Sequence, residues 1–470
     1  MSRRLVNHTT MALADVPLTD GWREAVDDFI YDWADEHDLP SLAVSVTTRE
    51  GEAHAEAFGS RNLAKNDTAT PDTLYGVGSV TKSFTACAVM QQVEDGSLAL
   101  EDSPADHTDV EFDGVEEITI HDLLCHASGL PSLAVSEALI ARQAEISEAA
   151  VPLGDREDFY HFLSGVGDEL DEQRRYMYCN SAYMLLADTI SAITDRPFAQ
   201  VVEERILEPL HMTRSTMDAT QYEHDDNTMT PYRREDKDDG WVETPTPIRE
   251  LSQGPGGLFT SVRELGRYLQ MYLDDGGGSD GSQVLEPSSI EAMVGGHTHT
   301  PLGQYGYGWR TRDLYDVTVH GHGGSIGVAT AYAGWAPDAG VGIALACNAA
   351  PDHGLSNVGE GVLAIILGHD PADVHGFFAK HQREQDVSGT YHSYRGVMKA
   401  TVEPIGQVLQ LTFTEPLEGS PLTLIYDSDT DDGYRYLTPN AEDGSTEVTF
   451  EANGSGGYDL FYDRWRLHQQ

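Results

Sequence analysis

A serine and a lysine three residues apart could supply a nucleophile and its base. Ser79 and Lys82 form a Ser-x-x-Lys tetrad where the apolar pattern predicts a helix over residues 79–93. Residues at i and i+3 share one face of a helix, so the two side chains can meet. A serine hydroxyl needs such a base, and burial can lower the pKa of a lysine enough to provide it. The tetrad alone is a weak motif, but this chain has only five lysines.

A second group of chemical interest is a Tyr-x-Asn triplet. Its phenol, Tyr178, could relay protons beside a lysine, and its amide, Asn180, could orient the lysine or hold a substrate carbonyl. Taken alone, the triplet is better interpreted as ordinary residues at the start of a helix over 181–193 than as a catalytic group.

A third group is rich in glycine. His322, Gly323, Gly324 and Ser325 stand at the edge of a predicted strand region. Glycines let a second backbone approach closely, as a substrate pairing along a strand edge would require. The backbone N–H of Ser325 could join that of Ser79 in an oxyanion hole. The alternative is a Gly-rich hairpin turn with a surface histidine.

The elements around these groups predict an α+β fold. Helical patterns open and close residues 20–370, and β-type runs lie just inside both ends. We therefore expect one antiparallel sheet built from both ends, flanked by helices, with a largely helical insertion between them. The runs that carry this prediction are helices over 22–33 and 355–367 and strands over 42–47, 53–58, 317–320, 328–335 and 341–347.

The C-terminal part of the chain has a different sequence pattern. Short alternating runs separated by Gly, Pro and Asp-Gly turns predict a small all-β barrel over residues 387–470. The expected organisation is an N-terminal extension, a main domain, a linker and this barrel, over residues 1–19, 20–370, 371–386 and 387–470.

The charge of the chain is strongly negative. Asp and Glu number 78 against 29 Lys and Arg, a net charge of −49. The even spread of acids and the scarcity of lysine favour adaptation to a cytosol of molar salt over binding of a polycation. No basic patch suits nucleic acid. No secretory signal and no run of 18 apolar residues is visible, so we expect a cytoplasmic protein without membrane contact.

A metal site finds little support in the sequence. The four cysteines match no zinc template. His121, Cys125 and His126 could be offered as ligands, but a role in capping and packing a helix is the better interpretation. We therefore expect no metal and no cofactor.

In order and rough spacing, the three groups resemble the serine β-lactamase-like superfamily. This superfamily includes class C β-lactamases, penicillin-binding DD-peptidases, D-aminopeptidases and related esterases. Within it, the chain resembles a CubicO-type serine hydrolase. Residues 121–130 look like its "HxLLxHxSGL" segment and residues 256–261 look like its "GGLxST" segment. The resemblance covers about residues 20–370. The barrel resembles the lipocalin-like C-terminal domains attached to some of these peptidases, and could act as a lid, a specificity element or an assembly contact.

The resemblance implies a division of labour. Ser79 would be acylated, and Lys82 and Tyr178 would share the base and acid roles. Substrate would be bound by Asn180, His322, Gly323, Gly324 and Ser325. Many relatives carry lysine at the histidine position, and a neutral imidazole binds the carboxylate of a β-lactam less well. One departure is that residues 170–175 lack the Pro-Gly that often precedes the tyrosine motif.

The resulting expectation is a serine hydrolase acting on a peptide or amide, as a D-aminopeptidase or DD-peptidase does. A carboxylesterase or weak β-lactamase on the same machinery is the first alternative. A catalytically inactive, penicillin-binding-like binding protein is the alternative from another class. The expected partners are a small-molecule or peptide substrate and, as a possibility left open, further copies of the chain.

Overall fold

The computed structural model divides the chain into two compact units, one ending at Gly368 and one beginning at His369. Most of the expected N-terminal extension falls outside the described residues. Those residues are 19–131, 155–171, 173–234, 240–246, 252–279, 281–315, 317–351, 354–414, 419–440 and 444–470.

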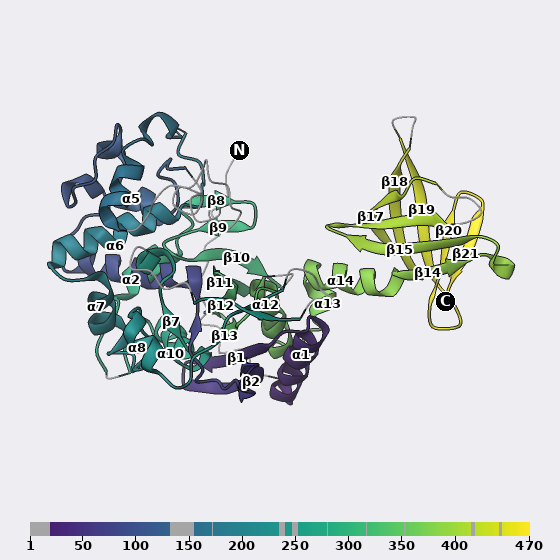
Figure 1. The fold of residues 1–470 in the computed structure, drawn as a ribbon, viewed down its shortest axis with the longest axis horizontal. Coiled ribbons are helices and arrows are strands. Elements are labelled where there is room, and N and C mark those ends of the chain that lie inside the picture. The colour runs from purple at the N-terminus through teal and green to yellow at the C-terminus, as the bar shows by residue number, and fades with distance from the viewer. Residues whose placement is uncertain are drawn as a thin grey trace, which may run out of the picture. The chain divides into compact units, whose positions relative to one another are not determined.

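A nine-stranded antiparallel sheet forms the centre of the first unit within these described ranges. Its order is β3-β2-β1-β13-β12-β11-β10-β9-β8, so β1 near the start of the unit pairs with β13 near its end (Figure 1). The predicted sheet from both chain ends is confirmed. The strands are β1 (Ser41–Thr48), β2 (Gly51–Asn62), β3 (Asp67–Thr68), β8 (Thr298–Thr300), β9 (Gly303–Tyr305), β10 (Arg310–Leu314), β11 (Val317–Ile326), β12 (Ala329–Ala336) and β13 (Val341–Cys347).

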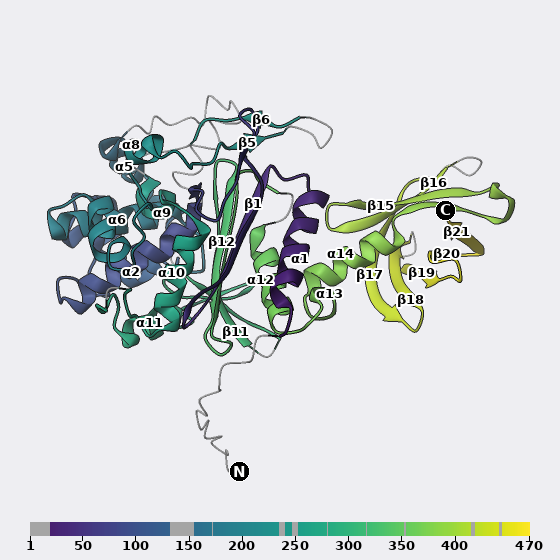
Figure 2. The same ribbon diagram turned by 90° about the horizontal axis from the view of Figure 1, so that it is seen from below.

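Helices cover both faces of the sheet. Helices α1 (Trp22–Glu36) and α12 (Leu355–Ile366) pack on one face, and α10 (Val262–Leu273) packs on the other (Figure 2). In α1 the buried side chains Trp22, Val26, Ile30 and Trp33 recur at helical spacing, which gives the helix one apolar side. Strand β1 is buried along almost its whole length because both of its faces are covered.

The insertion between the two halves of the sheet is mostly helical, as expected. Its central helix, α2 (Thr81–Glu94), is buried on nearly every side, which fits a sequence with small and apolar residues all round. The other elements are α3 (Ile120–Leu124), α5 (Arg156–Leu163), α6 (Asn180–Thr194), α7 (Phe198–Val202), α8 (Ala219–His224), α9 (Gln253–Gly256) and α11 (Pro287–Val294), with the two-residue strand pairs β4 (Tyr75–Gly76) with β7 (Phe259–Thr260) and β5 (Tyr232–Arg233) with β6 (Val242–Glu243).

The second unit contains a closed eight-stranded barrel, which confirms the predicted all-β domain. The stretch expected as a linker is largely helical, as α13 (Pro371–Val374) and α14 (Gly376–Val387). Alternate residues such as Leu409, Leu411 and Leu424 fill the barrel interior. The strands are β14 (Gly389–His392), β15 (Lys399–Ile405), β16 (Val408–Thr414), β17 (Leu422–Thr430), β18 (Gly433–Pro439), β19 (Ser445–Ala452), β20 (Tyr458–Tyr462) and β21 (Trp465–Gln469).

Across both units, none of the described helices has the length and apolar character needed to cross a bilayer.

Candidate active site

Ser79 and Lys82 meet at the start of α2, as their spacing predicts. Ser79 is half-buried in a single 3-10 turn (Gly78–Val80), and Lys82 lies in the first turn of the helix with no exposed surface. The Lys82 Nζ is 3.1 Å from Ser79 Oγ. It also lies 2.7 Å from Asn180 Oδ1 and 2.9 Å from the carbonyl oxygen of Pro255.

These contacts determine where a neutral lysine would direct its lone pair. Both the Asn180 Oδ1 and the Pro255 carbonyl can only accept hydrogen bonds. A neutral amine has two N–H groups, and these two acceptors occupy them, so its lone pair faces the Ser79 hydroxyl. Burial lowers the pKa of Lys82 from 10.5 to about 7, which makes the neutral form accessible near pH 7. Lys82 is thus arranged to accept the hydroxyl proton.

The Tyr-x-Asn triplet lies against the same amine. Asn180 is the first residue of α6, and Tyr178 is in the extended segment that leads into it. The Lys82 Nζ sits 4.7 Å from the centre of the Tyr178 ring. Burial raises the pKa of Tyr178, and a hydrogen bond with Ser79 opposes the rise. The group is therefore a neutral phenol in contact with the nucleophile, positioned to transfer a proton.

The glycine-rich group forms the end of β11 and approaches the nucleophile closely. A Cβ built on Gly324 would lie 1.9 Å from the Val77 carbonyl oxygen and 2.9 Å from Ser79 N. Gly78 has a φ of +50°, and a Cβ there would lie 2.5 Å from the backbone of Ser325. Only glycine allows these two backbones to pass so near each other. The backbones of Ser79 and Ser325 are thereby brought side by side, as an oxyanion hole requires.

The same end of β11 has an open edge. Strand β10 pairs with β11 only as far as Gly321, whereas β12 pairs with it through Ile326. In the described ranges, the β10 side of residues 322–326 therefore has no partner strand. An extended substrate could add there by backbone hydrogen bonds.

His322 is buried beside this edge and is 3% exposed, which excludes the alternative of a surface histidine on a turn. Its Nδ1 is 2.6 Å from the Gly323 carbonyl oxygen, which can only accept, so Nδ1 carries the proton. Its Nε2 then accepts from the Tyr305 hydroxyl at 3.0 Å. Burial, assisted by the charges of Lys82 and Arg310, lowers the pKa of His322 to about 3. The position that carries a cation in many relatives is neutral here.

The structure places all the site residues proposed from the sequence near one another. The sequence did not indicate several of their partners. Pro255 supplies a carbonyl to Lys82, and the Tyr305 hydroxyl donates to His322 Nε2. Arg310 donates to the Tyr176 hydroxyl at 3.0 Å and lies near the Tyr305 ring. These contacts join residues from separate elements, and no local spacing in the sequence indicates them.

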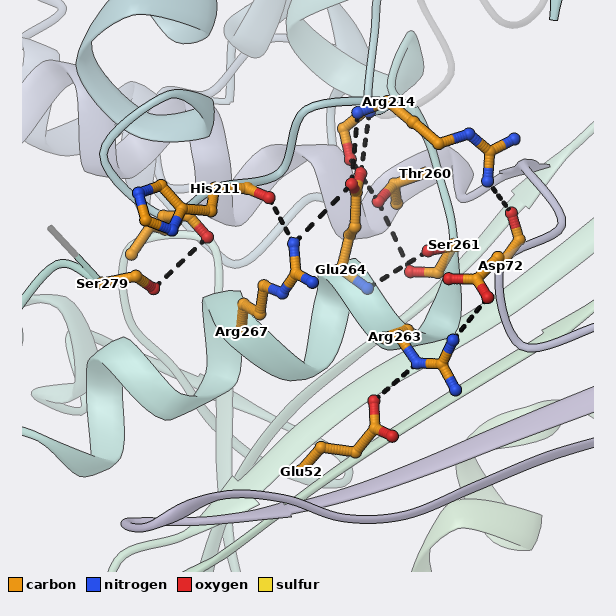
Figure 3. A network of polar contacts seen from close by, with 12 residues as sticks. Glu52, Asp72, His211, Arg214, Thr260, Ser261, Arg263, Glu264, Arg267 and Ser279 are labelled. Carbon is orange, nitrogen blue, oxygen red and sulfur yellow. Dashed lines mark hydrogen bonds and ion pairs between the residues drawn. The ribbon is translucent and has the colours of Figure 1, made fainter.

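A polar network holds the segment that leads into the nucleophile (Figure 3). Glu264, buried in the first turn of α10, accepts from the N–H of Ser215 at 2.8 Å and from its hydroxyl at 2.5 Å. Ser215 is also hydrogen-bonded to Thr260, which pairs with Tyr75 on β4. Arg263 ion-pairs with a carboxylate on β2 and one just before β4. The strand preceding Ser79 is thus fixed to α10 and to the sheet.

The residues considered as metal ligands have other partners. His121 Nδ1 is 2.7 Å from the Tyr307 hydroxyl, and His126 Nδ1 accepts from the N–H of Cys179 at 3.2 Å. Among the described residues, no group of three or more potential ligands could hold a metal ion.

Comparison with known proteins agrees with this fold. A model of the Beta-lactamase family matches residues 23–365, and the chain belongs to that family. A model described as the Pab87 octamerisation domain matches residues 371–468. Penicillin-binding protein 4 of Amycolatopsis lactamdurans is 26% identical over 334 residues, which cover 67% of this chain and 82% of that protein. The resemblance inferred from the three sequence groups is confirmed.

Solved structures resemble the chain to different extents. The octameric penicillin-binding protein homologue from Pyrococcus abyssi has a TM-score of 0.84 and 28% identity, covering 94% of this chain and 99% of its own. A D-stereospecific amidohydrolase from Streptomyces sp. has a TM-score of 0.61 and 22% identity, covering 73% of this chain and 98% of its own. A class C β-lactamase from Rhodobacter sphaeroides has a TM-score of 0.57 and 19% identity, covering 70% and 95%. These last two share the fold.

Proposed function

We propose that the protein is a serine hydrolase that works through an acyl-enzyme on Ser79. The observation that carries this proposal is the lone pair of a neutral Lys82 facing the Ser79 hydroxyl, because both N–H groups of the amine are taken by acceptors. A lysine so placed activates a hydroxyl that is otherwise a weak nucleophile. An inactive binding protein on this fold would not need to keep a buried lysine in this state.

The geometry supports a sequence of four steps. Ser79 Oγ attacks the substrate carbonyl while its proton passes to Lys82 Nζ. The N–H groups of Ser79 and Ser325 stabilise the oxyanion of the tetrahedral intermediate. Its collapse breaks the bond to the leaving group, which receives the proton from Lys82 through the Tyr178 hydroxyl. Water then attacks the ester carbonyl and gives a proton to the same pair of groups. Collapse of this second tetrahedral intermediate breaks the ester bond to Ser79 Oγ, which takes that proton back, so the acid leaves and both the Ser79 hydroxyl and neutral Lys82 are restored.

Substrate would bind along the open edge of β11, with Gly323 and Gly324 allowing the close approach and Asn180 contacting the acyl side. A cavity of about 320 Å³ opens next to this edge, lined in part by Tyr178, Arg310 and His322. Because His322 is neutral, Arg310 is the side chain in this lining that could meet an anionic group of the substrate. An extended, edge-pairing substrate favours a peptide or amide over a simple ester.

The D-stereospecific amidohydrolase and the penicillin-binding protein among the similar proteins support a peptidase or amidase with a D-residue near the scissile bond. Carboxylic esters and β-lactams are the alternative substrates for the same acyl-enzyme. Rates on D-aminoacyl amides and short peptides, compared with p-nitrophenyl esters and a chromogenic β-lactam, rank these substrates. Faster turnover of esters than of any amide would assign the esterase alternative.

The central experiment is active-site labelling with a fluorophosphonate in molar KCl. The native protein should react stoichiometrically and Ser79→Ala should not react. Ser164→Ala serves as the matched control and should label normally. It removes an exposed hydroxyl at the C-terminal end of α5, 85 residues from Ser79 in the sequence. If no labelling depends on Ser79, both catalytic hypotheses are wrong, and the inactive binding protein is the remaining hypothesis.

Assembly into an oligomer is the second part of the proposal. Residues 371–468 match a family model described as an octamerisation domain, and the similar protein from Pyrococcus abyssi is an octamer. We place the hydrolase domain at residues 20–370, with residues 371–386 connecting it to a barrel at 387–470 that mediates contact between copies. The charge of −49 supports operation in a cytoplasm of molar salt.

A further inference from the structure

The outer surface of the barrel carries a row of aliphatic side chains across four neighbouring strands. Ile405 on β15 pairs with Val408 on β16, and Ile425 on β17 pairs with Leu437 on β18. The ladder between β16 and β17 ends with Leu409 opposite Leu424, so Val408 and Ile425 are the next residues beyond the same end of that ladder. Directly opposed residues of a sheet point to the same face, so these four side chains form one continuous outer aliphatic row.

The two isoleucines of this row face solvent within the described unit, and Val408 and Leu437 are half-buried. Ile405 is 47% and Ile425 is 50% exposed, whereas their neighbours in the barrel interior, such as Leu409 and Leu424, are buried. The outer face of a small barrel is ordinarily polar, because its interior already takes the apolar residues. The row ends at Glu447, which lies opposite Leu437 and pairs with Arg435 at 3.3 Å. An apolar strip with a charged border is typical of a protein contact.

We propose that the outer aliphatic row is a surface by which one copy of the chain binds another. Two identical copies each carry 78 acidic and 29 basic residues, so their charged surfaces repel at most orientations. An uncharged row avoids that repulsion and provides an attraction that salt does not screen. The family model that matches this domain is described as an octamerisation domain, which favours a second copy of the chain as the partner that covers the row. This inference rests on the proposed assembly and names the residues that would achieve it.

The mass of the protein in molar KCl, measured by light scattering, tests the inference. The double variant Ile405→Ser with Ile425→Ser should lower the mass at least twofold. The pair Ile405→Thr with Ile425→Thr, which keeps β-branched side chains for folding, should act in the same direction. The control pair Tyr394→Ser with Val397→Ser removes side chains that are 80% and 62% exposed on the β14–β15 loop, and should leave the mass unchanged.

The two hypotheses fail differently. A native protein that is monomeric in molar KCl contradicts the proposed assembly itself. A native oligomer whose mass is unaffected by both Ile variants, or lowered equally by the control pair, contradicts the assignment of this row.

A separate observation concerns His126, which lies behind the tyrosine of the site. It is fully buried and adopts a φ of +58°, a left-handed conformation that is costly for a residue other than glycine. Its backbone carbonyl accepts from the N–H of Met177 at 2.9 Å, and its Nδ1 accepts from the N–H of Cys179 at 3.2 Å. The two N–H groups on either side of Tyr178 are therefore both bound to this one residue.

The ring of His126 also supports Tyr178 from the side. The two ring centres are 4.4 Å apart. The segment before α6 has no regular strand or helix pairing of its own, so the two hydrogen bonds to His126 fix its backbone. From this arrangement we infer that His126 is the positioning residue for Tyr178, holding the phenol against Ser79. The inference rests on the proposed hydrolase activity.

Two substitutions separate the acceptor from the ring. His126→Asn keeps an acceptor, because Asn Oδ1 occupies the place of His Nδ1, and asparagine tolerates a left-handed φ. His126→Phe keeps a ring and loses the acceptor. We expect His126→Phe to lower kcat about 10²-fold with KM within about threefold of the native value, consistent with a displaced proton-transfer group. His126→Asn should recover kcat to within about tenfold.

Melting temperatures of both variants distinguish this effect from unfolding, and fluorophosphonate labelling of the native protein verifies the activity on which it depends. A native protein that does not label contradicts the proposed function. Labelling and turnover of His126→Phe at the native rate, or an Asn variant as slow as the Phe variant at equal stability, contradicts the positioning role.

Discussion

At the scale of single residues, the protonation state of Lys82 controls the site. Its three neighbours at hydrogen-bond distance would satisfy a full ammonium group, but in that state it has no lone pair for Ser79. The cost of burying a charge at a fully enclosed position opposes the ammonium form, and among the described residues no carboxylate contacts the amine to offset this cost. The same enclosure leaves the phenol of Tyr178 protonated.

A pH dependence follows from these protonation states. The pKa of Lys82 is lowered from 10.5 to about 7, so the amine is charged and inactive below that pH and neutral above it. The kcat/KM should therefore rise with pH through about 7 and reach a plateau. Lys82→Arg should lose at least about 10³-fold at every pH, because arginine stays protonated.

Steady-state rates between about pH 5 and pH 9 in molar KCl check this expectation. Burial lowers the pKa of His322 to about 3, outside this range, so His322 does not complicate the profile. A flat profile, or an arginine variant that keeps substantial activity, would exclude Lys82 as the base.

At the scale of elements, the end of β11 must lie against the turn that holds Ser79. A Cβ at Gly324 would meet the Val77 carbonyl oxygen at 1.9 Å, and that atom is backbone and cannot turn aside. Gly324→Ala should therefore move β11 away from the nucleophile and slow acylation by about 10²- to 10³-fold, the range for loss of an oxyanion donor. Stopped-flow burst rates with a p-nitrophenyl ester measure this step.

Gly354→Ala is the matched control for this change. It adds the same methyl group at the start of α12, where no described residue apart from its chain neighbours lies within 4 Å and φ is −63°. Its burst rate and melting temperature should equal those of the native protein. If Gly324→Ala behaves like this control, the contact of β11 with Ser79 is not required for acylation.

The elements were also the part of the molecule most open to prediction from sequence. Apolar runs gave β1 and β13, and helical spacing gave α1, because burial on one or two faces leaves a direct pattern. The meeting of Ser79 and Lys82 was equally local. In contrast, the Pro255 carbonyl is 173 residues from Lys82 in the sequence. The hydrogen bond from the Cys179 N–H to His126, which helps to position Tyr178, joins residues 53 apart. Such contacts depend on how elements pack, and the residue types involved give no signal by themselves.

The prediction of a linker over 371–386 gave no secondary structure for that stretch. In the structure His375 caps α14 by accepting from the N–H of Phe377, and a Lys380–Glu384 pair at 3.0 Å supports the helix. Asp386 at the end of this helix accepts from the Tyr434 and Tyr458 hydroxyls of the barrel. The helix is therefore stabilised partly by the barrel, which sequence periodicity cannot reveal.

At the scale of the whole molecule, net charge sets the conditions under which the fold is stable. A charge of −49 on 470 residues produces repulsion that acts over about 10 Å at 0.1 M salt and about 3 Å at 1 M. Raising KCl from about 0.1 M to about 3 M should therefore raise the melting temperature by at least about 5 °C and increase turnover in parallel. Sucrose at matched water activity should give a smaller rise, since it favours compact states without screening charge. Differential scanning calorimetry measures both series. Equal melting temperatures in dilute buffer and in molar KCl would show that the acidic surface is not an adaptation to salt.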